Sequence, residues 1–373
     1  MLKKFEVENF KQFKDNLVFE LTAASYEFNS DCVKGGLVKT ALIYGKNGSG
    51  KSNLGWAIFD IIEHLTDHAK NIMARQHYLN ASSEQKTAKF NYHFYINKMN
   101  VDYSYEKDES RKLTNEKLKI NDEIVIIHQS GQLIYSTLKG TENLNKKLHE
   151  GSNLSALKYI DNNANLDLRT PFNKTFKQFM KFISEMLFFR SLLDQVAYIG
   201  FTNSSSNIYK DILQRDNLKD FESFLNEMGI ECKLSRCEDG GEPTIGFNLH
   251  GKIIPISAIA STGTKNLVLF YYWWQQIKDN KVSFLFIDEF DAFYHFKLSN
   301  AIVKRLKQLD TQVILTTHNT ALLSNELIRP DCGFILDGIT IKSLVQGTEK
   351  ELRNAHNLEK LYRAGLFTGE SNG

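Results

Sequence analysis

The sequence predicts an α/β fold in which a mixed sheet binds a nucleotide, with a flanking antiparallel β region and a helical insertion. Three observations support this prediction. A glycine-rich pattern typical of phosphate binding occupies residues 45–52, between a predicted strand and a predicted helix. Residues 283–289 form an apolar run that ends in two carboxylates. A second apolar run, residues 312–318, follows after one predicted helix, which is the arrangement of a parallel β-α-β unit.

The phosphate-binding pattern is G-x-x-x-x-G-K-[ST]. Its glycines let the backbone turn tightly, so that successive N–H groups point at phosphate oxygens. The lysine would neutralise the β and γ phosphates, and Ser52 would give a hydroxyl ligand to Mg²⁺. The residues expected to bind the nucleotide here are Gly45, Lys46, Asn47, Gly48, Ser49, Gly50, Lys51, Ser52 and Asn53.

The neighbouring sequence supports this interpretation. Residues 38–44 are mostly apolar and predict a short strand that enters the loop. Apolar side chains then recur at helical spacing between residues 54 and 65, so the dipole of a helix would also face the phosphates. The alternative, a glycine-rich turn with an incidental lysine, would need neither the preceding strand nor the following helix. We therefore predict that the chain binds a nucleoside triphosphate.

Asp288 and Glu289 end the apolar strand at residues 283–289. Such a strand places its last residues at the carboxyl edge of the sheet, where ligands of doubly wound folds bind. We expect Asp288 to orient Mg²⁺ and Glu289 to polarise the water that attacks the γ-phosphate. The alternative is that these carboxylates only form a charged turn after the strand. The phosphate loop upstream favours the functional interpretation over this alternative.

His318 ends the next predicted strand, after a crossover helix at residues 297–309. A lone histidine is more often structural, but this one follows the strand beside the two carboxylates. We therefore predict that its imidazole contacts the γ-phosphate or the attacking water.

Residues 256–267 contain small side chains around Gly263 and precede a strongly apolar helix at residues 267–277. Ser261 and Gly263 would lie at the N-terminus of this helix, which is suited to an anion. Because one phosphate loop is already present, a second anion-binding helix start needs a separate explanation.

The rest of the chain divides into three parts. Residues 1–142 hold the phosphate loop and a β-rich flank, with alternating strands at 5–10, 17–21, 89–105, 117–125 and 134–138. Residues 143–230 predict a helical insertion, and residues 231–373 contain the second half of the nucleotide site. Lys174, Lys177 and Lys181 lie near one helix face of the insertion, either as a solvated face or as a contact to phosphate backbone.

Composition limits the function classes. Lys and Arg number 46 against 44 for Asp and Glu, so a net charge of +2 does not indicate a nucleic-acid binder. The apolar runs fall short of the ~20 residues that cross a bilayer, and the first residues lack a signal-peptide core. Four scattered cysteines predict reduced thiols. We expect a cytoplasmic protein with no membrane partner.

Taken together, the chain resembles the ABC-type ATPases grouped with AAA proteins, in the branch of RecF, SMC and OLD-like proteins. Its signature region departs from the Leu-Ser-Gly-Gly form of transporters, which argues against a transporter subunit, and no Q-loop glutamine can be placed. The segments that carry the resemblance are 5–13 (first strand), 45–52 (Walker A), 261–265 (signature), 284–289 (Walker B), 290–295 (D-loop) and His318 (switch histidine).

The resemblance implies that ATP and Mg²⁺ are the cofactors and that two heads close face to face as a homodimer or higher homo-oligomer. Each nucleotide would lie between the Walker A loop of one head and the signature helix of the other, which would explain the helix start at Ser261 and Gly263. Hydrolysis would use Glu289, His318 and Lys51.

The tail, residues 357–365, also looks like ATPases of bacterial anti-phage systems such as PARIS and Septu or retron-linked modules. About 55 residues follow His318, too few for the Toprim nuclease domain of OLD-like enzymes, so we expect no nuclease in this chain. The leading hypothesis is an ATP-driven sensor or scaffold that controls a separate effector in anti-phage defence. The alternative is a RecF-like ATPase that clamps DNA.

Overall fold

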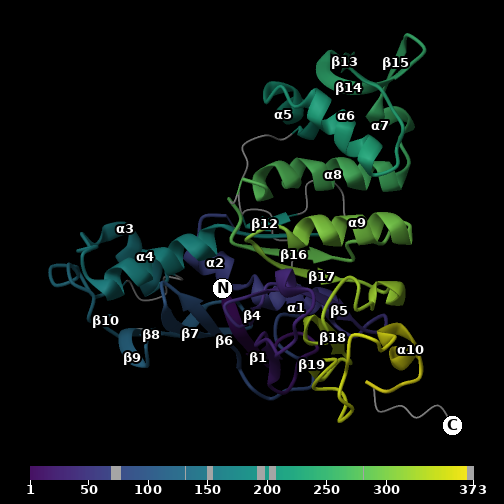
Figure 1. Cartoon of the computed structure of the whole chain (residues 1–373). Coiled ribbons are helices and arrows are strands. Elements are labelled where there is room, and N and C mark those ends of the chain that lie inside the picture. The colour runs from purple at the N-terminus through teal and green to yellow at the C-terminus, as the bar shows by residue number, and fades with distance from the viewer. Residues whose placement is uncertain are drawn as a thin grey trace.

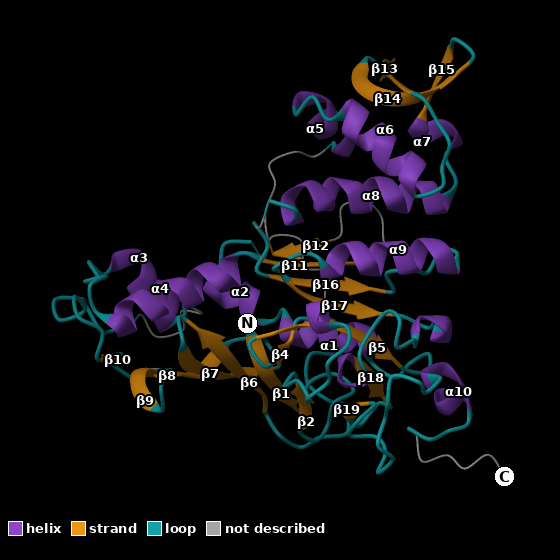
Figure 2. Cartoon of the chain, in the orientation of Figure 1, coloured by secondary structure: helices purple, strands orange, loops and turns teal. Residues whose placement is uncertain are grey.

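A seven-stranded central sheet forms the middle of the molecule (Figures 1 and 2). The computed structural model describes residues 1–68, 77–130, 132–148, 154–190, 198–200, 207–279 and 281–367. In sheet order the central strands are β12 (Tyr198–Gly200), β11 (Met186–Arg190), β16 (Phe284–Asp288), β17 (Gln312–Thr316), β5 (Thr40–Tyr44), β18 (Gly333–Leu336) and β19 (Ile341–Ser343). The five inner strands are parallel, and both edge strands are antiparallel.

Helices cover both faces of this sheet, which is why its inner strands β16, β17 and β5 are buried along their whole length and mostly apolar. The helices are α1 (Lys51–Ile58), α2 (Ile61–Leu65), α3 (Ala156–Asn163), α4 (Pro171–Ser184), α5 (Ile208–Gln214), α6 (Leu218–Glu227), α7 (Ile256–Ile259), α8 (Thr262–Ile277), α9 (Phe296–Lys307) and α10 (Leu358–Arg363). Short 3-10 turns occur at η1 (Ser30–Cys32), η2 (Thr320–Leu322) and η3 (Pro330–Cys332).

Alternate residues of the central strands face opposite layers. On one face, Phe188 packs edge-on against Trp56 of α1, with ring centroids 4.9 Å apart. Phe286 points to the same side, where the glycine at position 55 of α1 lets the helix approach its ring. On the other face, Phe189 stacks on Trp273 of α8. The sheet is therefore held between α1 and the α8–α9 layer, and this packing fixes the phosphate loop relative to β16 (Figure 1).

A second seven-stranded sheet lies beside the first and is antiparallel throughout. Its strands, in order, are β10 (Tyr135–Ser136), β9 (Glu123–Gln129), β8 (Leu113–Ile120), β7 (Met99–Asp108), β6 (Thr87–Ile96), β1 (Leu2–Glu8) and β2 (Leu17–Glu20). The predicted β-rich flank is confirmed, including the turn at Asn121 and Asp122. Helices α3 and α4 stand at one end of this sheet, with Phe179 against Phe94.

A smaller lobe lies above α8 (Figure 1). It combines α5, α6 and α7 with a three-stranded sheet of β13 (Leu234–Asp239), β14 (Glu242–Leu249) and β15 (Lys252–Pro255). Arg305 of α9 connects the layers, because its guanidinium lies 4.8 Å from the Trp274 ring and its Nη1 donates to Glu227. A short hairpin of β3 (Val33–Lys34) and β4 (Leu37–Val38) precedes β5.

Two secondary-structure predictions are corrected by these elements. The segment predicted as a helical insertion, residues 143–230, contains β11 and β12, and β11 is an inner strand of the central sheet. Its residues Met186–Phe189 are all buried, so a short apolar run was read as part of a helix. The helix expected across residues 54–65 is two helices, α1 and α2, that meet at Phe59 and Asp60.

A buried ion pair joins α2 to the antiparallel sheet. Lys107 of β7 and Asp60 are both fully buried, and the Lys107 ammonium lies 2.7 Å from an Asp60 carboxylate oxygen. Tyr105 and Tyr78 donate their hydroxyls to the same carboxylate, each at 3.0 Å. The carboxylate is thus fully compensated within an apolar region.

We predict that Lys107→Met lowers the free energy of unfolding by about 3–5 kcal/mol, because it leaves the buried Asp60 carboxylate without its cation. Urea unfolding at neutral pH measures this loss. Lys89→Met is the matched control on the neighbouring strand β6, since Lys89 pairs with Glu8 at 3.4 Å in a partly exposed position. The control should cost below about 1 kcal/mol. Equal losses for both variants would contradict the role given to the buried pair.

Candidate functional site

The phosphate-binding pattern forms a loop between β5 and α1, as the sequence predicts. Gly50 adopts φ +98°, and a Cβ there would lie 2.1 Å from Nε2 of Gln12. A Cβ at Gly45 would lie 2.4 Å from the Leu336 carbonyl oxygen of β18. Glycine is favoured at both positions, because a side chain at position 45 would clash with the β18 backbone and Gly50 has a left-handed backbone.

Lys51 is buried at the start of α1, and its ammonium is held by the loop itself. Its Nζ donates to the carbonyl oxygens of Gly45, at 2.8 Å, and Lys46, at 3.2 Å. Burial lowers the pKa of Lys51, while Asp288 and Glu289 act in the opposite direction. The positive charge therefore lies over the concave side of the loop.

Asp288 ends β16 and is completely buried. Ser52 donates its hydroxyl to Oδ2 at 2.6 Å, and Thr316 of β17 donates to Oδ1 at 2.7 Å. The Arg190 guanidinium of β11 lies beside Oδ2, with Nε at 2.8 Å. The structure thus brings the two residues predicted to hold Mg²⁺, Ser52 and Asp288, into direct contact.

Glu289 follows with a left-handed backbone, φ +51°, which is unusual for glutamate. Its N–H donates to the Thr316 hydroxyl at 2.7 Å, so β17 stabilises this turn. Within the described residues, its Oε2 atom is buried without a hydrogen-bond partner. Burial and the neighbouring Asp288 raise the pKa of Glu289, while Arg190 and Lys51 oppose the rise. A strained turn that presents an unpaired carboxylate oxygen is a feature of functional sites.

His318 lies two residues beyond β17. Burial and the nearby Lys51 lower its pKa, and Asp291 and Asp288 partly offset this. The imidazole is therefore neutral near pH 7. Asp291 is itself buried, accepts a hydrogen bond from the Thr317 hydroxyl at 2.7 Å, and has a pKa raised by burial. Its carboxylate holds the chain at residue 317, directly before the histidine.

A cavity of about 200 Å³ connects these groups. It brings the phosphate loop, Glu289 and His318 to one place at the carboxyl edge of the central sheet. Gly45, Lys46 and Ser49 belong to the same loop but do not line it. The lining residues are Gln12, Asn47, Gly48, Gly50, Lys51, Ser52, Asn53, Glu289 and His318.

The residues fit a nucleoside triphosphate with Mg²⁺. The loop is packed closely, because a Cβ at Gly45 or Gly50 would clash with Leu336 or Gln12, while Gly48 and Gly50 line the cavity. Besides the Glu289 oxygen, the hydroxyl of Ser49 is buried with no partner among the described residues. Ser52 and Asp288 offer the hard oxygen ligands that Mg²⁺ prefers. Lys51, the loop residues, Glu289 and His318 thus surround one small polar space, and Asp288 lies directly behind Ser52.

Ser261 and Gly263 lie apart from this cavity, at the start of α8. Ser261 is the exposed N-cap, and its hydroxyl accepts from the Thr264 N–H at 3.2 Å. A Cβ at Gly263 would lie 3.0 Å from the carbonyl oxygen of Phe293. The region predicted as signature therefore lies against the region predicted as D-loop, and neither lines the cavity of its own chain.

Sequence reasoning missed three residues of this site. Arg190 was assigned to the helical insertion, although it contacts Asp288. Gln12 lies in the turn between β1 and β2, where it donates to the Ser49 carbonyl at 2.8 Å and accepts from Asn53 at 2.9 Å. The Thr316 hydroxyl links the Asp288 carboxylate to the backbone N–H of Glu289. Only Thr316 carries a sequence signal, because it is a polar residue at the end of a predicted strand.

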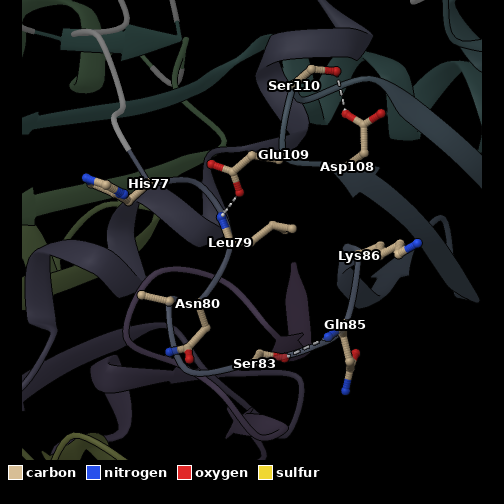
Figure 3. A pocket seen from close by; sticks show the side chains of 10 residues that line it. His77, Leu79, Asn80, Ser83, Gln85, Lys86, Asp108, Glu109 and Ser110 are labelled. Atoms are coloured by element: carbon tan, nitrogen blue, oxygen red, sulfur yellow. Dashed lines mark hydrogen bonds between the residues drawn. The ribbon is translucent and has the colours of Figure 1, made fainter.

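A larger and more open cavity, about 640 Å³, lies elsewhere, beside the loops at residues 77–86 and 108–110 (Figure 3). Glu109 accepts the Leu79 N–H there at 3.0 Å, and Ser110 donates to Asp108 at 2.6 Å. These polar groups bond to one another, and none of the predicted site residues lines this cavity.

Among the described helices, none has the length and apolar character needed to cross a bilayer.

Several solved structures resemble the chain. One is the SMC head domain from Thermotoga maritima (15% identity, TM-score 0.45), which covers 92% of this chain and 98% of its own. A second is the Smc head domain with an extended coiled coil bound to the C-terminal domain of ScpA derived from Pyrococcus furiosus. It is 14% identical with a TM-score of 0.46, and the match covers 92% of this chain and 96% of that chain. A third is the recombination mediator protein RecF with ATP. It is 14% identical with a TM-score of 0.42, and the match covers 92% of this chain and 99% of that chain. At such identities these likenesses say nothing of what this chain binds.

No curated protein matches the chain significantly. A protein-family model does match, and it spans residues 41–324, which is more than half of the chain and runs from β5 past His318. The matched segment includes the phosphate loop from Gly45, the start of α8 and the two carboxylates after β16. The chain therefore belongs to the AAA domain family described as "AAA domain, putative AbiEii toxin, Type IV TA system".

Proposed function

We propose that this protein is an ATPase whose ATP-driven cycle of association controls a separate effector in bacterial anti-phage defence. The observation that carries the proposal is the cavity in which Lys51, Glu289 and His318 face the phosphate loop. Membership of the AAA family supports the ATPase activity, and the family description refers to toxin systems. The narrower resemblance to PARIS and to Septu or retron-linked ATPases stays a prediction.

Each residue has a distinct role in this proposal. The loop amides from Gly45 to Ser52 would bind phosphate oxygens, and Lys51 would exchange its two loop carbonyls for phosphate. Ser52 and Asp288 would hold Mg²⁺, which neutralises charge on the phosphates when bound. Glu289 would accept a proton from the attacking water, and neutral His318 would position that water or the γ-phosphate.

The proposal places ATP between two copies of the chain. Ser261 and Gly263 support this arrangement, because they form an exposed start to a 16-residue helix and lie away from the cavity of their own chain. Phe293, which is 42% exposed, lies beside Gly263 and adds an apolar contact surface. A second copy that docks its α8 start over the cavity would complete the site.

The test is a pull-down of tagged Glu289→Gln protein from cells that carry its native operon, with ATP and Mg²⁺, followed by mass spectrometry. A stoichiometric neighbouring-gene product, such as a nuclease or toxin, is the expected result. The matched control is the Glu289→Gln, Lys51→Ala double variant, which should lose any partner that depends on bound ATP. Recovery of DNA without a protein partner would contradict effector control and favour a DNA clamp.

Two of the three lysines predicted on one face of α4, Lys177 and Lys181, give little support to DNA binding. Lys177 lies 2.7 Å from Asp161, and Lys181 lies 3.6 Å from Glu185. Their charges are matched within the fold, so we expect DNA to change the ATPase rate weakly. Strong stimulation by DNA with a steep salt dependence would be evidence for the clamp.

The pH dependence of hydrolysis follows from the pKa shifts. Glu289 must be ionised to act as a base, so kcat/KM should fall as the pH decreases and the carboxylate is protonated. Because the pKa of Glu289 is raised, this decline should occur at a pH above the ~4.3 at which an exposed glutamate titrates. The pKa of His318 is lowered, so His318 too becomes protonated on the acidic side of the pH profile. Initial rates between pH 4.5 and 9, as ~half-unit steps, measure the profile. In His318→Gln the acidic decline should persist; its loss would assign the decline to the histidine.

A further inference from the structure

Arg190 lies in the site but has no role in the proposed hydrolysis. It is the last residue of β11, and its Cα is the registered partner of Asp288 on the neighbouring parallel strand β16. The two strands therefore end side by side. This pairing directs a cation to the carboxyl edge of the sheet, where the phosphate loop begins its helix.

The guanidinium contacts both groups that would hold Mg²⁺. Its Nε lies 2.8 Å from Oδ2 of Asp288, and its Nη2 donates to the Ser52 hydroxyl at 3.4 Å. Ser52 in turn donates to the same Oδ2 at 2.6 Å. Arg190, Ser52 and Asp288 thus form a closed triangle in which the serine oxygen accepts from the arginine and its hydroxyl donates to the aspartate.

The electrostatics require a cation at this point. Asp288 is fully buried, and an isolated buried carboxylate is strongly disfavoured. The Arg190 side chain is only 23% exposed, so its charge is poorly screened by solvent. Lys51 is the other nearby cation, but its ammonium bonds to the loop carbonyls of Gly45 and Lys46. Arg190 is therefore the group that directly balances Asp288.

A divalent cation on Ser52 and Asp288 cannot coexist with this arrangement. Both cations would lie within a few ångströms of each other in a region of low dielectric, where like charges repel strongly. The metal would also have to approach the same two oxygens that Arg190 now contacts, Oγ of Ser52 and Oδ2 of Asp288. Metal binding must break the contacts of Arg190.

We propose that Arg190 is a positioning residue that acts as an internal substitute for Mg²⁺: it balances Asp288 and holds Ser52 in place until the metal enters with ATP and displaces it. This inference rests on the proposed function, because it takes Ser52 and Asp288 as the metal-binding groups. One consequence is that the free protein binds divalent cations weakly. Metal and nucleotide would then enter together, since the phosphates add the ligands that make the exchange favourable.

The test measures metal affinity without nucleotide. Mn²⁺, which prefers similar oxygen ligands, is titrated into each protein, and free Mn²⁺ is followed by electron paramagnetic resonance. Arg190→Ala and Arg190→Gln should bind Mn²⁺ at least about tenfold more tightly than the wild type, because a repelling charge is removed. Arg190→Lys keeps the charge and should resemble the wild type. Should Arg190→Ala fail to fold, Arg190→Gln removes the same charge while filling the space.

Arg236→Ala is the matched control, since it removes the same charge from an exposed ion pair with Asp216 in the small lobe. Its Mn²⁺ affinity should equal that of the wild type. Thermal unfolding gives a second readout: the neutral Arg190 variants should melt earlier than the wild type without metal and gain more from Mg²⁺ alone. Both effects distinguish loss of a metal substitute from loss of a merely structural contact.

Equal Mn²⁺ affinities in the wild type and the neutral Arg190 variants would overturn the inference, while leaving the ATPase proposal intact if all of them bind ATP with Mg²⁺. A wild-type protein that binds no ATP with Mg²⁺ would contradict the proposed function itself, and the inference with it. The ATP titration in the presence of Mg²⁺ is therefore made on the same samples.

Discussion

Replacement of Lys51 by alanine should abolish hydrolysis and weaken ATP binding by about two to three orders of magnitude. The buried ammonium lies over the loop on the carbonyl oxygens of Gly45 and Lys46 and would exchange them for phosphate oxygens. Charge-assisted hydrogen bonds contribute about 1.5–3 kcal/mol each, so losing two of them, at the lower part of this range, accounts for the expected factor. Titration with a fluorescent ATP analogue and a phosphate-release assay measure the two effects.

Lys34→Ala is the control for Lys51. Lys34 is an exposed lysine on the hairpin before β5, where it pairs with the exposed Asp310. The Lys34→Ala substitution removes the same charge outside the site and should leave ATP affinity unchanged. Wild-type ATP affinity in Lys51→Ala would refute the interpretation of residues 45–52 as a phosphate-binding loop.

Replacement of Glu289 by glutamine should lower the hydrolysis rate by about 10²–10⁴-fold while ATP binding persists, because the amide keeps the shape of the side chain but cannot accept the proton. Trapped ATP should then hold two copies together. Light scattering after size-exclusion chromatography, with ATP and Mg²⁺, measures the dimer, and phosphate release measures the rate.

Two comparisons make this prediction specific. Adding Lys51→Ala to Glu289→Gln should return the protein to its ATP-free association state, because the second change prevents ATP from binding. Glu242→Gln, a change at the exposed first residue of β14, should hydrolyse ATP like the wild type. An unchanged rate in Glu289→Gln would show that another group activates the water.

The local sequence predicted the elements that depend on neighbouring residues. The phosphate loop, the strand that enters it and the strands at 284–288 and 312–316 were all predicted, because glycine spacing and apolar runs are local properties. The same holds for the hairpins of the antiparallel sheet, where alternating residues show which face is buried. The contact of Ser52 with Asp288 follows once a parallel sheet places both strand ends at one edge.

What the tertiary structure alone decided is the environment of these groups. Met186–Phe189 is too short an apolar run to be told from a helix, and it becomes a strand because the edge of β16 offers its backbone a partner. That pairing brings Arg190 to Asp288, 98 residues later in the chain. Gln12 reaches the loop only because β1 lies in the adjacent sheet. Such contacts join segments far apart in the sequence, so no local pattern records them; strand pairing within the central sheet determines the first, and the position of the second sheet determines the other.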